Sequence, residues 1–164
     1  MEKINFRKIK YLVTLIILGI MFLYPTADVL ASCEATETKI DDIYLENGDY
    51  ITTEIEVVNG GISYRASSLT GKKTITYSTA NGTKLWSFTV TGTFSYTGSS
   101  SSCTYVTTSY SINSNAWKVT STSSSKSGNT ATGSVTAKEY FSFAVINTVN
   151  HTLTLSCSAN GSIS

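Results

Sequence analysis

The segment WSFTVTGTFSY, residues 86–96, constrains the fold more than any other part of the chain. Its apolar residues alternate with serine and threonine over the whole segment: Trp86, Phe88, Val90, Phe94 and Tyr96. A period of two places apolar side chains on one face of a β-strand and polar side chains on the other. No helical period of comparable length occurs after residue 31. We therefore predict an all-β fold.

Asn-Gly pairs mark the turns between the expected strands. Asn81-Gly82 is the strongest hairpin signal, because both turn residues must tolerate positive φ. A turn there would place two apolar pairs on one face, Tyr77 with Trp86 and Ile75 with Phe88. Asn47-Gly48 is a further candidate turn.

Asn59-Gly60 predicts another hairpin by the same reasoning. Its turn would pair Val57 with Ile62, Ile55 with Tyr64 and Glu54 with Arg65.

Further strands are expected over residues 103–113, 116–123, 130–138, 140–146 and 148–158. Two serine-rich stretches, 97–102 and 122–130, read as loops. Many short strands separated by turns are typical of a single antiparallel β-sandwich or a small barrel. We expect this domain to span residues 50–164, after an acidic segment at 32–49.

Residues 1–31 have the features of a signal peptide. A basic start precedes an apolar run at residues 11–23, and Pro25 follows it. The run is shorter than the roughly twenty residues that cross a bilayer. We therefore expect a secreted, extracellular protein.

The sequence LASC, residues 30–33, also matches a lipobox. Processing there would leave a lipid on Cys33 and hold the protein at the outer face of the cytoplasmic membrane. Pro25 and Asp28 separate the apolar run from this motif, which favours soluble release. Lipidation of Cys33 is the alternative.

An exported chain with three cysteines can form one disulfide. Cys157 shares a face with Leu153 and Leu155, and Cys103 begins an expected strand. We predict a Cys103–Cys157 disulfide, which would contribute about 4 kcal/mol in the chain-entropy model. The alternative is that both cysteines are reduced, small buried hydrophobic residues.

Charge is divided sharply along the chain. Residues 32–56 carry eight acidic residues and one basic residue, whereas residues 57–164 carry seven basic residues and one acidic residue. This division indicates that the acidic segment folds against the basic body, or that the body meets anionic partners. The bases form no cluster with a nucleic-acid-binding motif, so we do not expect nucleic acid as a partner.

Motifs for catalysis are missing from the sequence. His151 alternates with Leu153 and Leu155, as a half-buried strand residue would, and no G-x-S-x-G elbow accompanies it. No metal-ligand spacing or glycine-rich phosphate loop occurs, and no two carboxylates stand out as a glycosidase pair. We expect no enzyme activity, catalytic residue, metal or cofactor.

The region from Thr83 to the end resembles an uncharacterised family of small secreted Ser/Thr-rich β proteins from Gram-positive bacteria. The matching features are the W-x-F-x-V-x-G-x-F-x-Y strand, a cysteine soon after it, AWKV, SSSKSGNTA and a final L-x-C-x-x-N-G. The resemblance implies an extracellular β-sandwich with cysteines near Cys103 and Cys157. It implies no catalytic residue, and Cys33 is outside the pattern.

The expected function is therefore binding. We predict an interaction module at the bacterial envelope or a host surface, whose partner is an extracellular protein, a glycan or an anionic envelope polymer. A membrane would be a partner only if Cys33 is lipidated. The alternatives are a small secreted toxin of the bacteriocin type and, disfavoured by the motif search, a secreted hydrolase.

Overall fold

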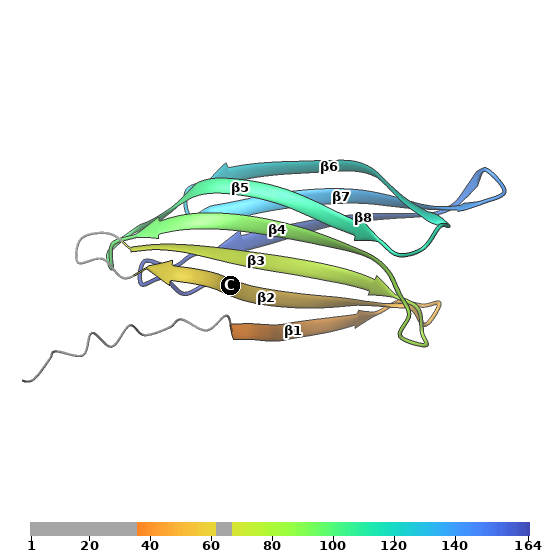
Figure 1. Cartoon of the computed structure of the whole chain (residues 1–164), viewed down its shortest axis with the longest axis horizontal. Helices are drawn as coiled ribbons and strands as arrows, with labels where there is room; N and C mark the ends of the chain where they lie inside the picture. The colour runs from red at the N-terminus through yellow and green to blue at the C-terminus, as the bar shows by residue number, and fades with distance from the viewer. Residues whose placement is uncertain (1–35, 62–66) are drawn as a thin grey trace, which may run out of the picture. The chain divides into compact units, whose positions relative to one another are not determined.

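The computed structural model describes residues 36–61 and 67–164, which form two antiparallel β-sheets (Figure 1). The first sheet has the order β1-β2-β3-β4-β5, and the second has the order β6-β7-β8. The strands are β1 (Thr36–Tyr44), β2 (Tyr50–Gly61), β3 (Ser67–Ser78), β4 (Lys84–Tyr96), β5 (Ser101–Ile112), β6 (Trp117–Ser127), β7 (Thr130–Phe141) and β8 (Ala144–Ser156). No helix that could cross a membrane occurs in the described ranges.

The predicted all-β sandwich is confirmed, and the small-barrel alternative is wrong because the two sheets do not close into one. The chain passes from the first sheet to the second between β5 and β6. Main-chain hydrogen bonds hold both ends of this connection, from Asn113 N to Leu85 O at 2.9 Å and from Tyr140 N to Ala116 O at 2.8 Å. β1 begins inside the acidic segment expected at residues 32–49, so this segment contributes an edge strand to the first sheet.

The predicted hairpin at Asn81-Gly82 is confirmed. Tyr77 lies opposite Trp86 and Ile75 opposite Phe88, and Gly82 has a φ of 86°. Gly48, in the β1–β2 connection, has the same φ. Both glycines adopt a conformation that a side chain would disfavour, which is why the sequence signal was reliable.

The predicted hairpin at Asn59-Gly60 is wrong. β2 continues through both residues, which pair with Thr70 and Leu69 of β3. Glu54 consequently lies opposite Thr74 rather than Arg65; Ile62, Tyr64 and Arg65 are outside the described residues. Here tertiary pairing with a long neighbouring strand outweighs the local turn preference.

Two predictions about the later strands are also wrong. Residues 122–130 are mostly strand rather than loop, because β6 extends to Ser127 and pairs with β7 as far as Thr130. Residues 140–146 are not a separate strand: they contain the turn between β7 and β8.

The core combines an aromatic cluster with a close approach of the two sheets. The Tyr77 and Trp86 rings stack at 5.6 Å, and Trp117 of the second sheet lies 5.1 Å and 6.1 Å from them, centroid to centroid. Farther along the strands, a Cβ atom at Gly133 would lie only 2.4 Å from Val90 Cγ2. Glycine at this position therefore sets how closely β7 can approach β4.

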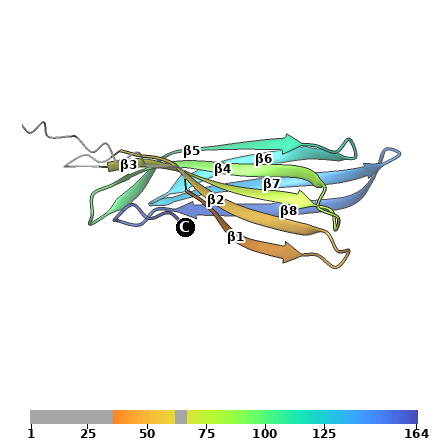
Figure 2. The same cartoon turned by 60° about the horizontal axis from the view of Figure 1, so that its bottom comes forward.

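The second sheet is narrower than the first. Its edge strand β8 packs over β3 and β4 rather than over β1 and β2 (Figures 1 and 2). The inner face of β1 and β2 therefore projects past β8, and none of the eight strands fills the space beside β8.

Candidate functional site

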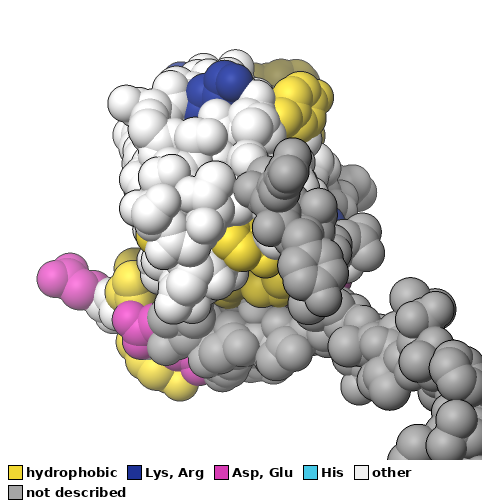
Figure 3. All heavy atoms as spheres, turned by 90° about the vertical axis from the view of Figure 1, so that its left-hand side faces the viewer, with side chains coloured by type: hydrophobic (Ala, Val, Ile, Leu, Met, Phe, Trp, Pro, Cys, Tyr) yellow, Lys and Arg dark blue, Asp and Glu magenta, His cyan; other side chains and the backbone are white. Residues whose placement is uncertain are grey.

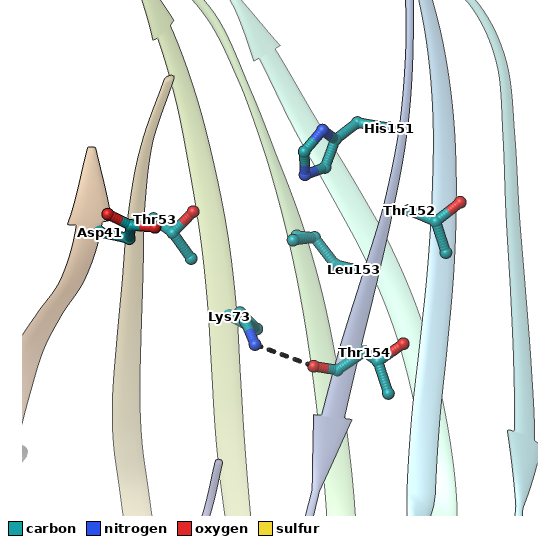
Figure 4. Close-up of a pocket in the computed structure, with 7 residues that line it drawn as sticks. All are labelled: Asp41, Thr53, Lys73, His151, Thr152, Leu153 and Thr154. Atoms are coloured by element: carbon teal, nitrogen blue, oxygen red, sulfur yellow. Dashed lines mark hydrogen bonds between the residues drawn. The ribbon is translucent and has the colours of Figure 1, made fainter. Parts of the chain in front are cut away.

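A groove occupies the space beside β8, between the inner face of β1–β2 and the edge of the second sheet. Its polar part, about 370 Å³, is shown in Figure 4 and is lined by Asp41, Thr53, Lys73, His151, Thr152, Leu153 and Thr154. A second part, about 610 Å³, shares His151 and is lined mainly by Ile43, Leu45, Asn47, Ile51, Tyr77 and Asn147–Asn150. We call the two parts together the β8 groove.

The edge of β8 presents main-chain hydrogen-bonding groups to this groove. Lys73 Nζ donates to Thr154 O at 3.1 Å, so this carbonyl points away from β7 (Figure 4). The β7–β8 ladder is regular from Thr148 to Ser156. Because direction alternates along an antiparallel strand, Thr148, Asn150 and Thr152 also direct their N–H and C=O groups outward.

The two ends of this edge differ. At Ser156 the outward groups pair with Ser164, through N–H···O contacts of 2.9 Å and 3.0 Å. Within the described part of the chain, the outward groups of Thr148, Asn150 and Thr152 have no main-chain partner. The groove thus contains three alternate positions along β8 that could each donate and accept one further hydrogen bond.

The opposite wall comes from β1 and β2. A register shift between Lys39 and Asp41 places Asp41 opposite Thr53 and Ile43 opposite Ile51. Tyr77 anchors the β1–β2 loop, because its hydroxyl donates to Asp49 Oδ2 at 3.1 Å. Burial, together with this hydrogen bond, raises the pKa of Tyr77.

His151 is half-buried on β8 and points into the groove (Figure 4), as the sequence predicted for a strand position. Burial lowers the pKa of His151 below its ordinary value of 6.5, so the imidazole is neutral at pH 7. Among the described residues it makes no hydrogen bond to a serine, and no group of three histidine, cysteine or acidic residues is placed to hold a metal. The groove offers both polar and apolar side chains for contact with a ligand.

Cys103 and Cys157 are both buried, as expected, but they are free thiols, so the predicted disulfide is absent from the structure. The two sulfurs are not at disulfide distance, and each contacts a carbonyl of its own segment: Cys103 Sγ contacts Tyr105 O at 3.3 Å, and Cys157 Sγ contacts Ser158 O at 3.4 Å. Burial raises the pKa of both thiols. Cys33 and the signal peptide predicted at residues 1–31 lie outside the described residues.

The sequence analysis did not identify the β8 groove. Asp41, Lys73 and His151 are far apart in the sequence, and strand alternation does not reveal which strand forms the edge of a sheet. The β7–β8 turn was not identified as unusual either. Its sign in the sequence is the unbroken apolar run FAVI at residues 143–146, where the other turns carry polar residues.

No protein-family model, curated protein or solved structure matches this chain. The resemblance to secreted Gram-positive β proteins therefore stays a prediction.

Proposed function

We propose that the protein is an exported, non-catalytic binding module that acts at the bacterial envelope or a host surface. Its β8 groove would receive an extended segment of a partner protein. The observation that carries this proposal is the row of outward main-chain groups at Thr148, Asn150 and Thr152 beside an open groove.

An extended segment suits this edge because it can add to the second sheet as a fourth strand. Strand addition takes affinity from main-chain hydrogen bonds and specificity from pockets for alternate side chains. Sheet edges in most proteins are protected by charged side chains, proline or bulges. The stretch of β8 from Thr148 to Ser156 carries none of these apart from the neutral His151.

The walls would select the side chains of the bound segment. Ile43, Ile51 and Val149 offer apolar contacts in one part of the groove. Asp41 and Lys73 offer opposite charges in the other part. A matching segment would carry apolar residues toward the first part and a charged residue toward the second.

A proline substitution tests the main-chain contacts without removing a side chain that the fold needs. In Thr152→Pro, the lost N–H is one that points away from β7, so the ladder is kept and an edge strand tolerates the change. Thr152→Val is the matched control, because it retains the N–H. Thermal unfolding would establish that both variants are folded.

Binding would be measured on washed bacterial envelopes and on immobilised extracellular-matrix proteins. We expect the proline variant to bind at least roughly tenfold more weakly than the unchanged protein, and the valine variant to bind like the unchanged protein. Protease treatment of the surface should abolish binding. Equal binding by both variants would contradict the strand-addition proposal. Binding that survives protease would point instead to a glycan or an anionic polymer.

A further inference from the structure

The turn between β7 and β8 exposes large apolar side chains at its tip. Phe143 is fully exposed, with a relative accessibility of 101%, and Phe141 is 71% exposed. Val145 and Ile146 are exposed as well. We call these four residues the apolar tip. Burying side chains of this size in an apolar medium is favourable, so a cluster of them on a surface marks an interaction site.

The backbone of the tip is unusual for the residues that it carries. Ser142 and Phe143 both have positive φ, 45° and 75°, between the paired residues Phe141 and Ala144. Such two-residue turns favour Asn-Gly, and a bulky residue with positive φ is a genuine outlier. The turn therefore holds Phe143 outward at some cost in stability, which indicates a role outside the core.

The β7–β8 ribbon also reaches farther along the strand direction than the other turns at its end of the sandwich (Figures 1 and 2). β6 begins at Trp117, which pairs with Glu139, so the tip extends beyond the third strand. A narrow projection offers little area for a flat protein–protein interface, whereas it can enter a fluid layer.

Two lysines stand behind the tip. Lys118 and Lys138 are direct neighbours across the β6–β7 ladder, and neither forms an ion pair within the described residues. Like charges opposite each other destabilise a sheet, so an anionic partner would relieve their repulsion. Lys118 Nζ lies 5.2 Å from the centre of the Tyr140 ring, which directs it along the ribbon.

The distance between the apolar tip and the two lysines matches the depth of the headgroup layer of a bilayer. Lys138 is four residues from Ser142, or roughly 13 Å along an extended strand. Interfacial segments bury their apolar side about 5–10 Å into the boundary between headgroups and acyl chains, which would leave the lysines level with the phosphates. Glu139 lies next to Lys138 in the sequence and is acidic, but Lys118, Lys138 and Glu139 together still carry a net positive charge.

We propose that the apolar tip inserts into the surface of a lipid bilayer rich in anionic phospholipid. Phe143 and its neighbours enter the acyl region, and Lys118 and Lys138 contact the headgroup phosphates. The β1–β2 hairpin also exposes Ile43 and Tyr44, but Asp41 and Glu46 accompany them, so this hairpin does not suit an anionic surface.

A tryptophan placed at the tip would report insertion directly. The native Trp86 and Trp117 are buried, so the additional signal of Phe143→Trp comes from the tip. Ser99→Trp, in the exposed β4–β5 turn, is the matched control at the other end of the sandwich. Figure 3 shows that end, where hydrophobic side chains appear in separate patches among polar ones. The apolar run at residues 11–23 is present in every variant, so the local probe rather than total binding carries the test.

The vesicles would contain phosphatidylglycerol and lipids brominated near the top of the acyl chains. We expect bromine quenching and a blue shift for Phe143→Trp but not for Ser99→Trp. In the Phe143→Trp background, each of Lys118→Gln and Lys138→Gln should raise the lipid concentration needed for half-maximal quenching about fivefold. Absent quenching at the tip, or quenching equal to that of the control, would overturn the proposal.

Quenching that is unchanged in pure phosphatidylcholine would refute the role of the lysines. Binding to cells that needs Phe143, without quenching in protein-free vesicles, would show a protein partner instead and overturn the lipid proposal. Thr152→Pro should leave quenching unchanged, because the tip does not depend on the β8 groove.

Discussion

Replacing Gly133 by alanine tests how closely the two sheets approach. The added Cβ would lie 2.4 Å from Val90 Cγ2 and 2.7 Å from Thr108 Cγ2, well inside normal contact distance. Val90 is fully buried on β4, so it has little room to move. We expect Gly133→Ala to lower the free energy of unfolding by about 1–3 kcal/mol, the usual cost of overpacking.

The cause can be separated from a general intolerance of alanine by a double-mutant cycle with Val90→Ala. Val90→Ala alone removes two buried methyl groups and should cost roughly 2–3 kcal/mol through lost burial and a cavity. The double variant removes the 2.4 Å contact with Val90 Cγ2 and keeps the 2.7 Å contact with Thr108 Cγ2, so its cost should fall below the sum of the single costs by about 0.5–1 kcal/mol.

Urea unfolding followed by tryptophan fluorescence measures each free energy. Ser134→Ala, at the neighbouring position that faces outward and bonds Thr152, serves as the control and should cost no more than about 1 kcal/mol. The reasoning would be refuted if Gly133→Ala were neutral, or if the costs of the two core substitutions simply added.

Three further predictions follow from buried or strained groups. Burial lowers the pKa of His151, so the unfolded chain binds this proton more readily, and the free energy of unfolding should fall as the pH drops below about 6.5. Urea titrations across this range should show a smaller decline in His151→Gln. An equal decline in both proteins would refute the role of His151. Cys103 and Cys157 are buried, and their pKa values are raised. Alkylation followed by peptide mapping should therefore find both thiols unmodified in the native protein and both modified in denaturant. Fast labelling of the native protein would contradict their burial. Phe143→Gly should raise the free energy of unfolding by about 1 kcal/mol, because glycine adopts positive φ without steric cost; a loss of stability would show that Phe143 makes contacts that the structure lacks.

Strand alternation and turn chemistry determined the fold class and much of the register. At the β3–β4 hairpin, an Asn-Gly turn and an alternating apolar face gave the same pairing of Tyr77 with Trp86. Agreement between these two levels makes a sequence-based prediction reliable. At Asn59-Gly60 the local turn signal stood alone, and the long pairing of β2 with β3 overrode it.

The pairing of the cysteines could not be obtained from the sequence. Strand position correctly predicted that Cys157 is buried. A disulfide also requires suitable separation and direction of the two side chains, and these depend on how β5 lies relative to the chain after β8. In the structure each thiol points to a carbonyl of its own segment instead.

The two candidate sites depend on tertiary structure for a common reason. The sequence by itself determined which residues lie in strands and, for most, which face of a strand they occupy, because these follow from the pleat and from local sterics. Only the tertiary structure decided that β8 is an edge beside an overhanging sheet and that the β7–β8 ribbon extends past β6. Edges and projections result from how many strands each sheet contains and where each strand ends relative to its neighbours, and no single segment encodes either property.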